Sequence, residues 1–193
     1  MAETSTKAKI ISFIIFVVVT IIIKVVVPGV YNGYTVYNDY KDCAAYDTKP
    51  ANAIKACTDL LRVAHATKNK FAIDQAPYVV LFLHLAHIHA GHDDQQEFER
   101  NSLPYLKGNW PAPILALYLG KTTADDVYAK AKPRQVKDDD DQPCEAKFYV
   151  GKWYLRNNTK DEAKKAFQSA SSTCGADQME QALARDQLKT LEP

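Results

Sequence analysis

The sequence has little excess of either charge and few glycines. Its 24 Lys and Arg nearly balance 23 Asp and Glu, which gives a net charge of +1. Proteins that bind nucleic acid usually gather positive charge on one face, so this balance argues against a nucleic-acid partner. The chain contains no GxSxG, no glycine-rich phosphate loop and no HExxH motif, which are typical of nucleophilic, nucleotide-binding and zinc-hydrolytic sites. We therefore expect no enzyme activity and no cofactor.

A long apolar run lies near the N-terminus. From Ile10 to Val27 the residues are apolar at every position except Ser12, Thr20 and Lys24. As a helix this run spans about 27 Å at ~1.5 Å per residue, close to the thickness of a bilayer core. The sequence predicts a short N-terminal tail at residues 1–9 and a transmembrane anchor at residues 10–29.

The residues that flank this run indicate its orientation. Lys7 and Lys9 precede it, and positive charge favours the cytoplasmic side of a membrane. The C-terminal domain is then exported. A cleaved signal peptide is the alternative, but the run exceeds the usual length for one and Val27, Pro28 and Gly29 make a poor cleavage site.

The remaining residues, 30–193, favour an all-α domain of short antiparallel helices, because helix formers are interrupted by turn signals at intervals of about fifteen residues. The clearest helical hairpin lies between Cys144 and Cys174. Its first helix ends near Asn157, and Thr159 with Glu162 three residues later predicts a capping box at the start of the second helix. A further apolar pattern predicts a terminal helix from Asp177 to Leu191 that covers this hairpin.

Small and aromatic residues alternate along this hairpin at fixed spacing: Val150, Gly151, Tyr154, Ala163, Phe167 and Ala170. This pattern resembles the tetratricopeptide repeat, with residues 144–175 as the best copy. The resemblance implies an α-solenoid, in which Tyr154 and Phe167 fill the space where small residues bring the two helices together. Two positions depart from the pattern. Lys147 replaces a common aromatic, which suggests an exposed edge, and Gly175 replaces the usual closing Pro.

The segment from Trp110 to Val127 resembles an inter-repeat element of bacterial periplasmic repeat proteins. Together with the hairpin it is similar to the NlpI-type lipoproteins over roughly residues 77–190. The resemblance implies a bacterial inner-membrane protein with a periplasmic domain that binds other proteins. An organellar inner membrane stays open. No lipobox Cys follows the anchor, so lipid attachment is not implied.

The four cysteines can pair in three ways. In the repeat model the first helix starts where the second ends, which brings Cys144 and Cys174 close together. Cys43 and Cys57 flank a turn in a similar way. Two such bonds would fit an oxidising compartment. Four free thiols in a reducing compartment are the alternative.

Four of the five histidines lie within nine positions: His84, His87, His89 and His92. If the segment is one helix, His84 and His87 lie on one face, and so do His89 and His92. His87 and His89 point in nearly opposite directions. A two-histidine metal site is therefore the most that the pattern allows, with Asp93 or Asp94 as a further ligand. We favour solvated or partner-contacting histidines. Four successive aspartates at residues 138–141 favour a solvated loop over a calcium site, because the EF-hand spacing is missing.

Four tyrosines repeat at every third position directly after the anchor: Tyr31, Tyr34, Tyr37 and Tyr40. This stripe can pack on the next helix, lie at the membrane surface or contact a membrane partner.

The sequence as a whole predicts a non-enzymatic, membrane-anchored scaffold or adaptor with protein partners. Two alternatives remain. One is an accessory single-span subunit of a membrane complex. The other is a metal-binding module that uses the His84–His92 cluster.

Overall fold

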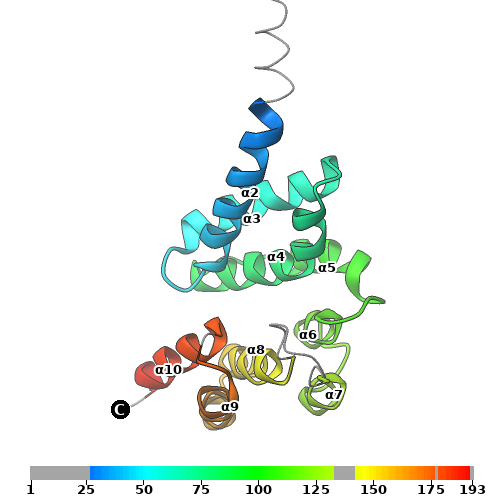
Figure 1. The fold of residues 1–193 in the computed structure, drawn as a ribbon. Coiled ribbons are helices and arrows are strands. Elements are labelled where there is room, and N and C mark those ends of the chain that lie inside the picture. The colour runs from blue at the N-terminus through cyan, green and yellow to red at the C-terminus, as the bar shows by residue number, and fades with distance from the viewer. Residues whose placement is uncertain (1–26, 133–141, 177, 192–193) are drawn as a thin grey trace, which may run out of the picture. The chain divides into compact units, whose positions relative to one another are not determined.

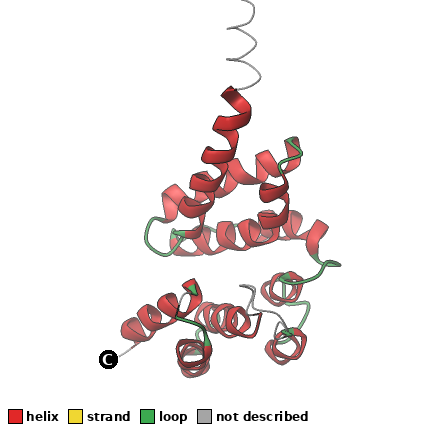
Figure 2. Ribbon diagram, in the orientation of Figure 1, coloured by secondary structure: helices red, strands yellow, loops and turns green. Residues whose placement is uncertain are grey.

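The computed structural model describes residues 27–132, 142–176 and 178–191, with side chains from residue 35 onward. Throughout these ranges the regular structure is helical, without strands (Figure 1, Figure 2). This confirms the predicted all-α class. The anchor predicted at residues 10–29 lies almost wholly outside the described residues. The sequence predicts one helical domain from residue 30 onward, whereas the described residues divide after Asp94 into two compact units.

The first unit consists of three packed helices, α2 (Val27–Ala44), α3 (Pro50–Ala66) and α4 (Lys70–His89). Pro50 occupies the first turn of α3, where a missing backbone N–H costs nothing. Asn69 caps α4 by accepting a hydrogen bond from the backbone N–H of Ala72 at 2.9 Å. A disulfide between Cys43 and Cys57 joins α2 to α3, with Cα atoms 4.8 Å apart.

Helix α4 forms the core of the first unit. Its buried residues occupy every side of the helix from Val79 to Ala86, as expected of a helix surrounded by protein. By length and composition α4 could also cross a membrane, but more than half of that stretch is buried within the protein. Tyr46 stacks on Phe82 with ring centroids 5.5 Å apart, so α4 is packed as a core helix of this unit.

The second unit is built around α8 (Gln142–Arg156), which packs against four other helices. They are α6 (Ala112–Tyr118), α7 (Ala124–Lys130), α9 (Lys160–Thr173) and α10 (Met179–Leu191). The unit opens with α5 (Gln95–Ser102) and a 3-10 turn at Leu103–Tyr105. Helices α8 and α9 form the predicted antiparallel hairpin, and α10 packs on both of them.

The hairpin closes tightly at Gly151. A Cβ atom at this position would lie 2.7 Å from Cε1 of Phe167, which is fully buried. Only glycine allows the Phe167 ring to lie directly against the backbone of α8. Ala163 and Ala170 are also fully buried on α9, so small residues face the neighbouring helix one turn on either side of Phe167.

One local prediction in this hairpin is wrong. Thr159 does not make the predicted capping box: its hydroxyl donates to the backbone oxygen of Tyr154 at 3.0 Å, which completes the end of α8. The chain reverses through Asn158, which has a left-handed φ of 59°. In the terminal helix the buried contacts come from Gln181 and Ala184, whereas Met179 is 40% exposed.

Candidate functional site

A groove of about 420 Å³ lies on the second unit, between α7, α8 and α9. Nine residues line it: Tyr128, Ala131, Pro143, Lys147, Tyr154, Glu162, Lys165, Ala166 and Ser169. Since all three helices contribute, the groove depends on the packing of the α8–α9 hairpin. Ala166 supplies part of its wall while burying its methyl group in the hairpin.

Two tyrosines form the aromatic end of this groove. Burial, followed by the neighbouring Tyr154 and Asp125, raises the pKa of the Tyr128 hydroxyl to about 12. Burial also raises the pKa of Tyr154, with added contributions from the carboxylates of Asp125 and Glu162. Both hydroxyls are therefore uncharged at neutral pH, and each can donate a hydrogen bond to a carbonyl or carboxylate oxygen of a ligand.

The opposite end of the groove is basic. Lys147 is half-buried, and its Nζ donates to Oγ1 of Thr173 at 2.8 Å. Lys165 is exposed one turn from Ser169 on α9. The expected exposed edge at Lys147 is thus the wall of a groove, where the alkyl stem packs and the ammonium group meets solvent.

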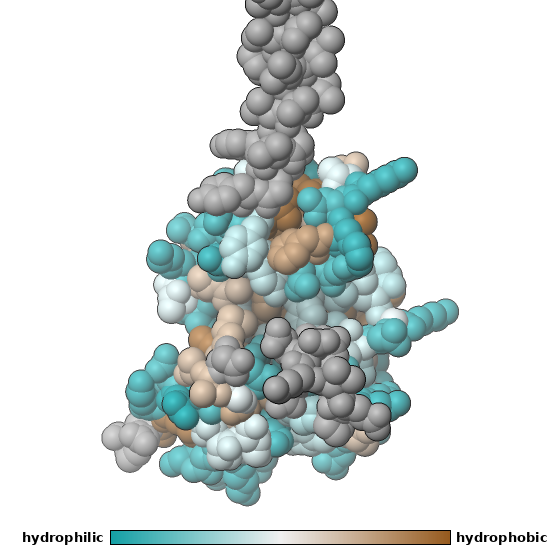
Figure 3. Space-filling view, in the orientation of Figure 1, coloured by the Kyte–Doolittle hydropathy of each residue, from teal (hydrophilic) through white to brown (hydrophobic). Residues whose placement is uncertain are grey.

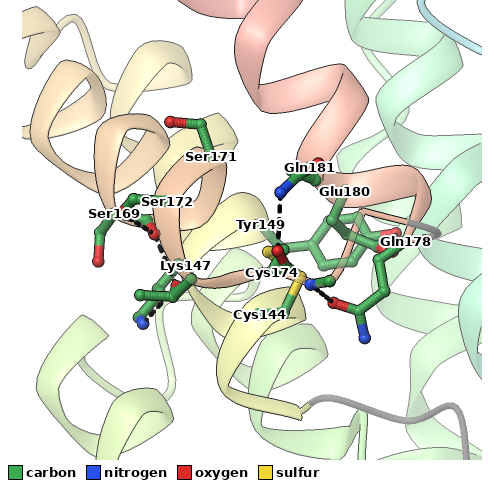
Figure 4. Close-up of a disulfide and its surroundings, with 12 residues drawn as sticks. Cys144, Lys147, Tyr149, Ser169, Ser171, Ser172, Cys174, Gln178, Glu180 and Gln181 are labelled. Atoms are coloured by element: carbon green, nitrogen blue, oxygen red, sulfur yellow. Dashed lines mark hydrogen bonds between the residues drawn. A yellow bond between two sulfur atoms is a disulfide. The ribbon is translucent and has the colours of Figure 1, made fainter.

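A disulfide between Cys144 and Cys174 holds the basic end of the hairpin (Figure 4). The Cα atoms are 5.0 Å apart, and both residues are buried. Gln181 on α10 donates from Nε2 to the backbone oxygen of Cys174 at 2.7 Å. These contacts fix the level at which α9 ends beside the start of α8, as the repeat model anticipated. Both disulfides fit an oxidising, extracytoplasmic compartment.

The six residues of the repeat-like pattern fall into two groups in the structure. Five are buried in the hairpin: Val150, Gly151, Ala163, Phe167 and Ala170. Tyr154 is different, because it is half-buried and lines the groove beside Tyr128. At Gly151 it is the Phe167 ring that fills the space between the two helices.

Sequence reasoning did not identify Tyr128, Lys165, Ser169 or Glu162 as site residues. They share one property, a position on a single face of α7 or α9 that meets the Lys147 face of α8. The signal available in the sequence was the spacing of Glu162, Lys165 and Ser169, which places them along one side of a helix. Their convergence on Tyr128 depends on how α7 packs against α8, and the spacing of residues within each helix does not predict that packing.

The histidine cluster is distributed over different partners. His84 is buried, and its Nδ1 lies 2.8 and 2.9 Å from the two carboxylate oxygens of Asp94. The expectation of a solvated side chain is wrong for His84. His89 pairs with Asp47 at 2.6 Å. Within the described ranges, no group of three or more His, Cys, Asp or Glu side chains comes together that could hold a metal ion.

The tyrosine stripe packs partly within the first unit. The Tyr40 ring meets Phe71 at a centroid distance of 5.4 Å and Phe82 at 6.1 Å. Tyr37 also meets Phe71, at 6.4 Å, but is 49% exposed. The side chains of Tyr31 and Tyr34 lie outside the described part of the chain. Tyr40 thus packs on α4, the second helix after α2, while Tyr37 leaves an exposed aromatic face.

Comparison with protein-family models, curated proteins and solved structures finds no match to this chain.

Proposed function

We propose that this protein is a non-enzymatic, membrane-anchored adaptor of the tetratricopeptide type, which docks a segment of a partner protein in the groove of its second unit. The observation that supports this most is the groove itself, about 420 Å³ in volume and lined by nine residues from three helices. Its size falls in the range of binding sites. The tight Gly151–Phe167 contact and the buried small residues of α9 support the repeat assignment.

The dimensions of the groove suit an extended peptide. Pro143 and Tyr154 line it eleven residues apart on α8, which is about 16 Å at ~1.5 Å per residue. An extended segment of roughly five residues covers the same length at ~3.3 Å per residue. The Tyr128 and Tyr154 rings offer apolar surface, and their hydroxyls can donate to backbone carbonyl groups of the bound segment.

The proposed location is the inner membrane, with the N-terminus in the cytoplasm and both units in the periplasm. The apolar run from Ile10 to Val27 and the basic flank before it support the anchor and its direction. The two disulfides support the oxidising side. Mass spectrometry of non-reduced protein from its native membrane should detect both linked peptide pairs. Four alkylated free thiols would contradict this location.

Adjacent substitutions on α9 test the docking proposal. Ser169 lines the groove, whereas Gln168 is exposed next to it and does not. We expect S169W to block the groove and abolish copurification of the partner with the full-length protein from native membranes. Q168W adds the same bulk outside the groove and should leave copurification intact. Equal recovery of the partner with both variants would place docking elsewhere.

One observation favours the second candidate function, an accessory subunit of a membrane complex. The rings of Tyr37 and Phe71 on the first unit meet at 6.4 Å and are exposed at 49% and 38%. Ile73 is exposed at 46% on another side of α4, and Figure 3 shows apolar surface on this unit. Exposed apolar patches often mark protein interfaces. The subunits of a stable complex would copurify at fixed stoichiometry. F71S/I73S would abolish this copurification and S169W would not. The adaptor function predicts the reverse.

A further inference from the structure

The end of α4 brings two histidines together that the groove does not use. His84 and His89 are engaged by Asp94 and Asp47. His87 and His92 instead face each other, with their Nδ1 atoms 3.4 Å apart. His87 is half-buried and His92 is exposed. The pair is therefore open to solvent and to ions in it.

The backbone holds this pair in place. After α4 ends at His89, Gly91 takes a left-handed φ of 71°, which glycine adopts without steric cost. This turn lets the backbone N–H of His92 donate to the backbone oxygen of His87 at 2.9 Å, as in the Schellman motif that closes many helices. His87 and His92 are thus joined by a main-chain hydrogen bond, and their side chains emerge beside each other.

The separation of the two nitrogens matches that of two ligands on one metal ion. Zinc binds imidazole nitrogen at about 2.0–2.1 Å with tetrahedral geometry, which places two ligand nitrogens about 3.3 Å apart. One Nδ1–H can donate a hydrogen bond to the other Nδ1 across 3.4 Å. A metal ion instead binds the lone pairs of both nitrogens at once. The C-terminal end of a helix carries partial negative charge, which further favours a cation at this position.

We propose that His87 and His92 form an open two-histidine site for Zn²⁺ at the C-terminal end of α4, with water in the remaining positions. The ion lies between the two Nδ1 atoms. The site needs neither the groove nor a partner protein, so it extends beyond the proposed adaptor function. It differs from the pairing expected from helical spacing, because Gly91 turns the chain and sets His92 beside His87 instead of His89.

Calorimetric titration of the full-length protein with Zn²⁺ in detergent tests this site. We expect one ion per chain for the wild type and no binding for H87A/H92A. The matched control is H65A, which removes the exposed histidine of α3 and should bind as the wild type does. G91A strains the turn and should weaken binding about tenfold or more, the range seen when groups that orient metal ligands are lost.

Histidine ring resonances give an independent readout by NMR. Zn²⁺ should shift the rings of His87 and His92 and leave that of His65 unchanged. Circular dichroism should show that H87A/H92A keeps its helices, and H87Q/H92Q provides a second substitution that retains polarity at both positions. Unchanged ring resonances, or equal Zn²⁺ binding by the wild type and either double variant, would overturn the proposal.

Discussion

The disulfide of the second unit allows a quantitative test of how the hairpin is held. Cys144 and Cys174 are 30 residues apart, and the loss of chain entropy for a closed loop of that length corresponds to about 3.6 kcal/mol. We predict that C144A/C174A lowers the free energy of unfolding by about this amount. Typical domains are stable by only ~5–15 kcal/mol, so the change is a large fraction of the total.

Tryptophan emission makes this measurement specific to one unit. The chain has 2 Trp, Trp110 and Trp153, and both lie in the unit of residues 95–193. Urea unfolding of the full-length protein in detergent, followed by emission, therefore reports on the unit that contains the bond. A shift below about 1 kcal/mol would contradict this prediction, because it would mean that the disulfide does not restrict the unfolded chain as the entropy model requires.

The other disulfide provides the comparison. Cys43 and Cys57 are 14 residues apart, for which the same relation gives about 3.0 kcal/mol. C43A/C57A should shift the unfolding transition of the first unit, which far-ultraviolet circular dichroism detects along with that of the second. Its effect on tryptophan emission measures how strongly the two units are coupled in unfolding.

Three further substitutions test packing and electrostatics. G151A should destabilise the second unit by about 1–3 kcal/mol, because the added Cβ would lie 2.7 Å from the Phe167 ring and overpacking exceeds the gain in helix propensity. D94A should cost about 1–3 kcal/mol, since it removes the carboxylate that is hydrogen-bonded to Nδ1 of the buried His84. In Y128F the free energy of unfolding should fall less between pH 10 and 12 than it does in the wild type. In this window the unfolded chain loses a proton that folded Tyr128 keeps, because its pKa is raised to about 12.

Urea midpoints measure all three effects, and each has a control. G151A combined with F167L should recover stability, because the smaller side chain leaves room for the methyl group. D74A removes an exposed ion pair with Lys70 and should change stability by less than about 1 kcal/mol. For Y128F the control is pH itself: at pH 7 Tyr128 keeps its proton in both the folded and the unfolded chain, so this contribution to the pH dependence should be absent there. If a control shows the same change in stability as its test variant, the contact proposed to cause that change is contradicted.

Local sequence patterns predicted the hairpin but not the surroundings of each residue. Gly151, Ala163 and Phe167 were predictable because helical spacing and residue size together specify how two adjacent helices approach. The pairing of Cys144 with Cys174 follows from the same geometry. The position of Tyr154 beside Tyr128 could not be predicted, because spacing gives the face of a helix on which a residue lies but not the helix that covers that face.

The histidines show a different limit. His84 looked like part of an exposed cluster, yet its helix is surrounded by protein and Asp94 reaches it from beyond the end of α4. The pairing of His87 with His92 depends on the left-handed Gly91. A helix continued by simple periodicity through His92 points these side chains differently, so a turn of one residue changes which ligands meet.

The most direct test of docking in the groove is site-specific photocrosslinking of the full-length protein in its native membrane. A photoreactive residue at Tyr154 lies inside the groove, and one at Gln168 lies outside it. We predict that the residue at position 154, and not the one at position 168, crosslinks to the protein that copurifies with the wild type, and that S169W abolishes this crosslink. Equal crosslinking from both positions, or a crosslink that survives S169W, would contradict docking in the groove.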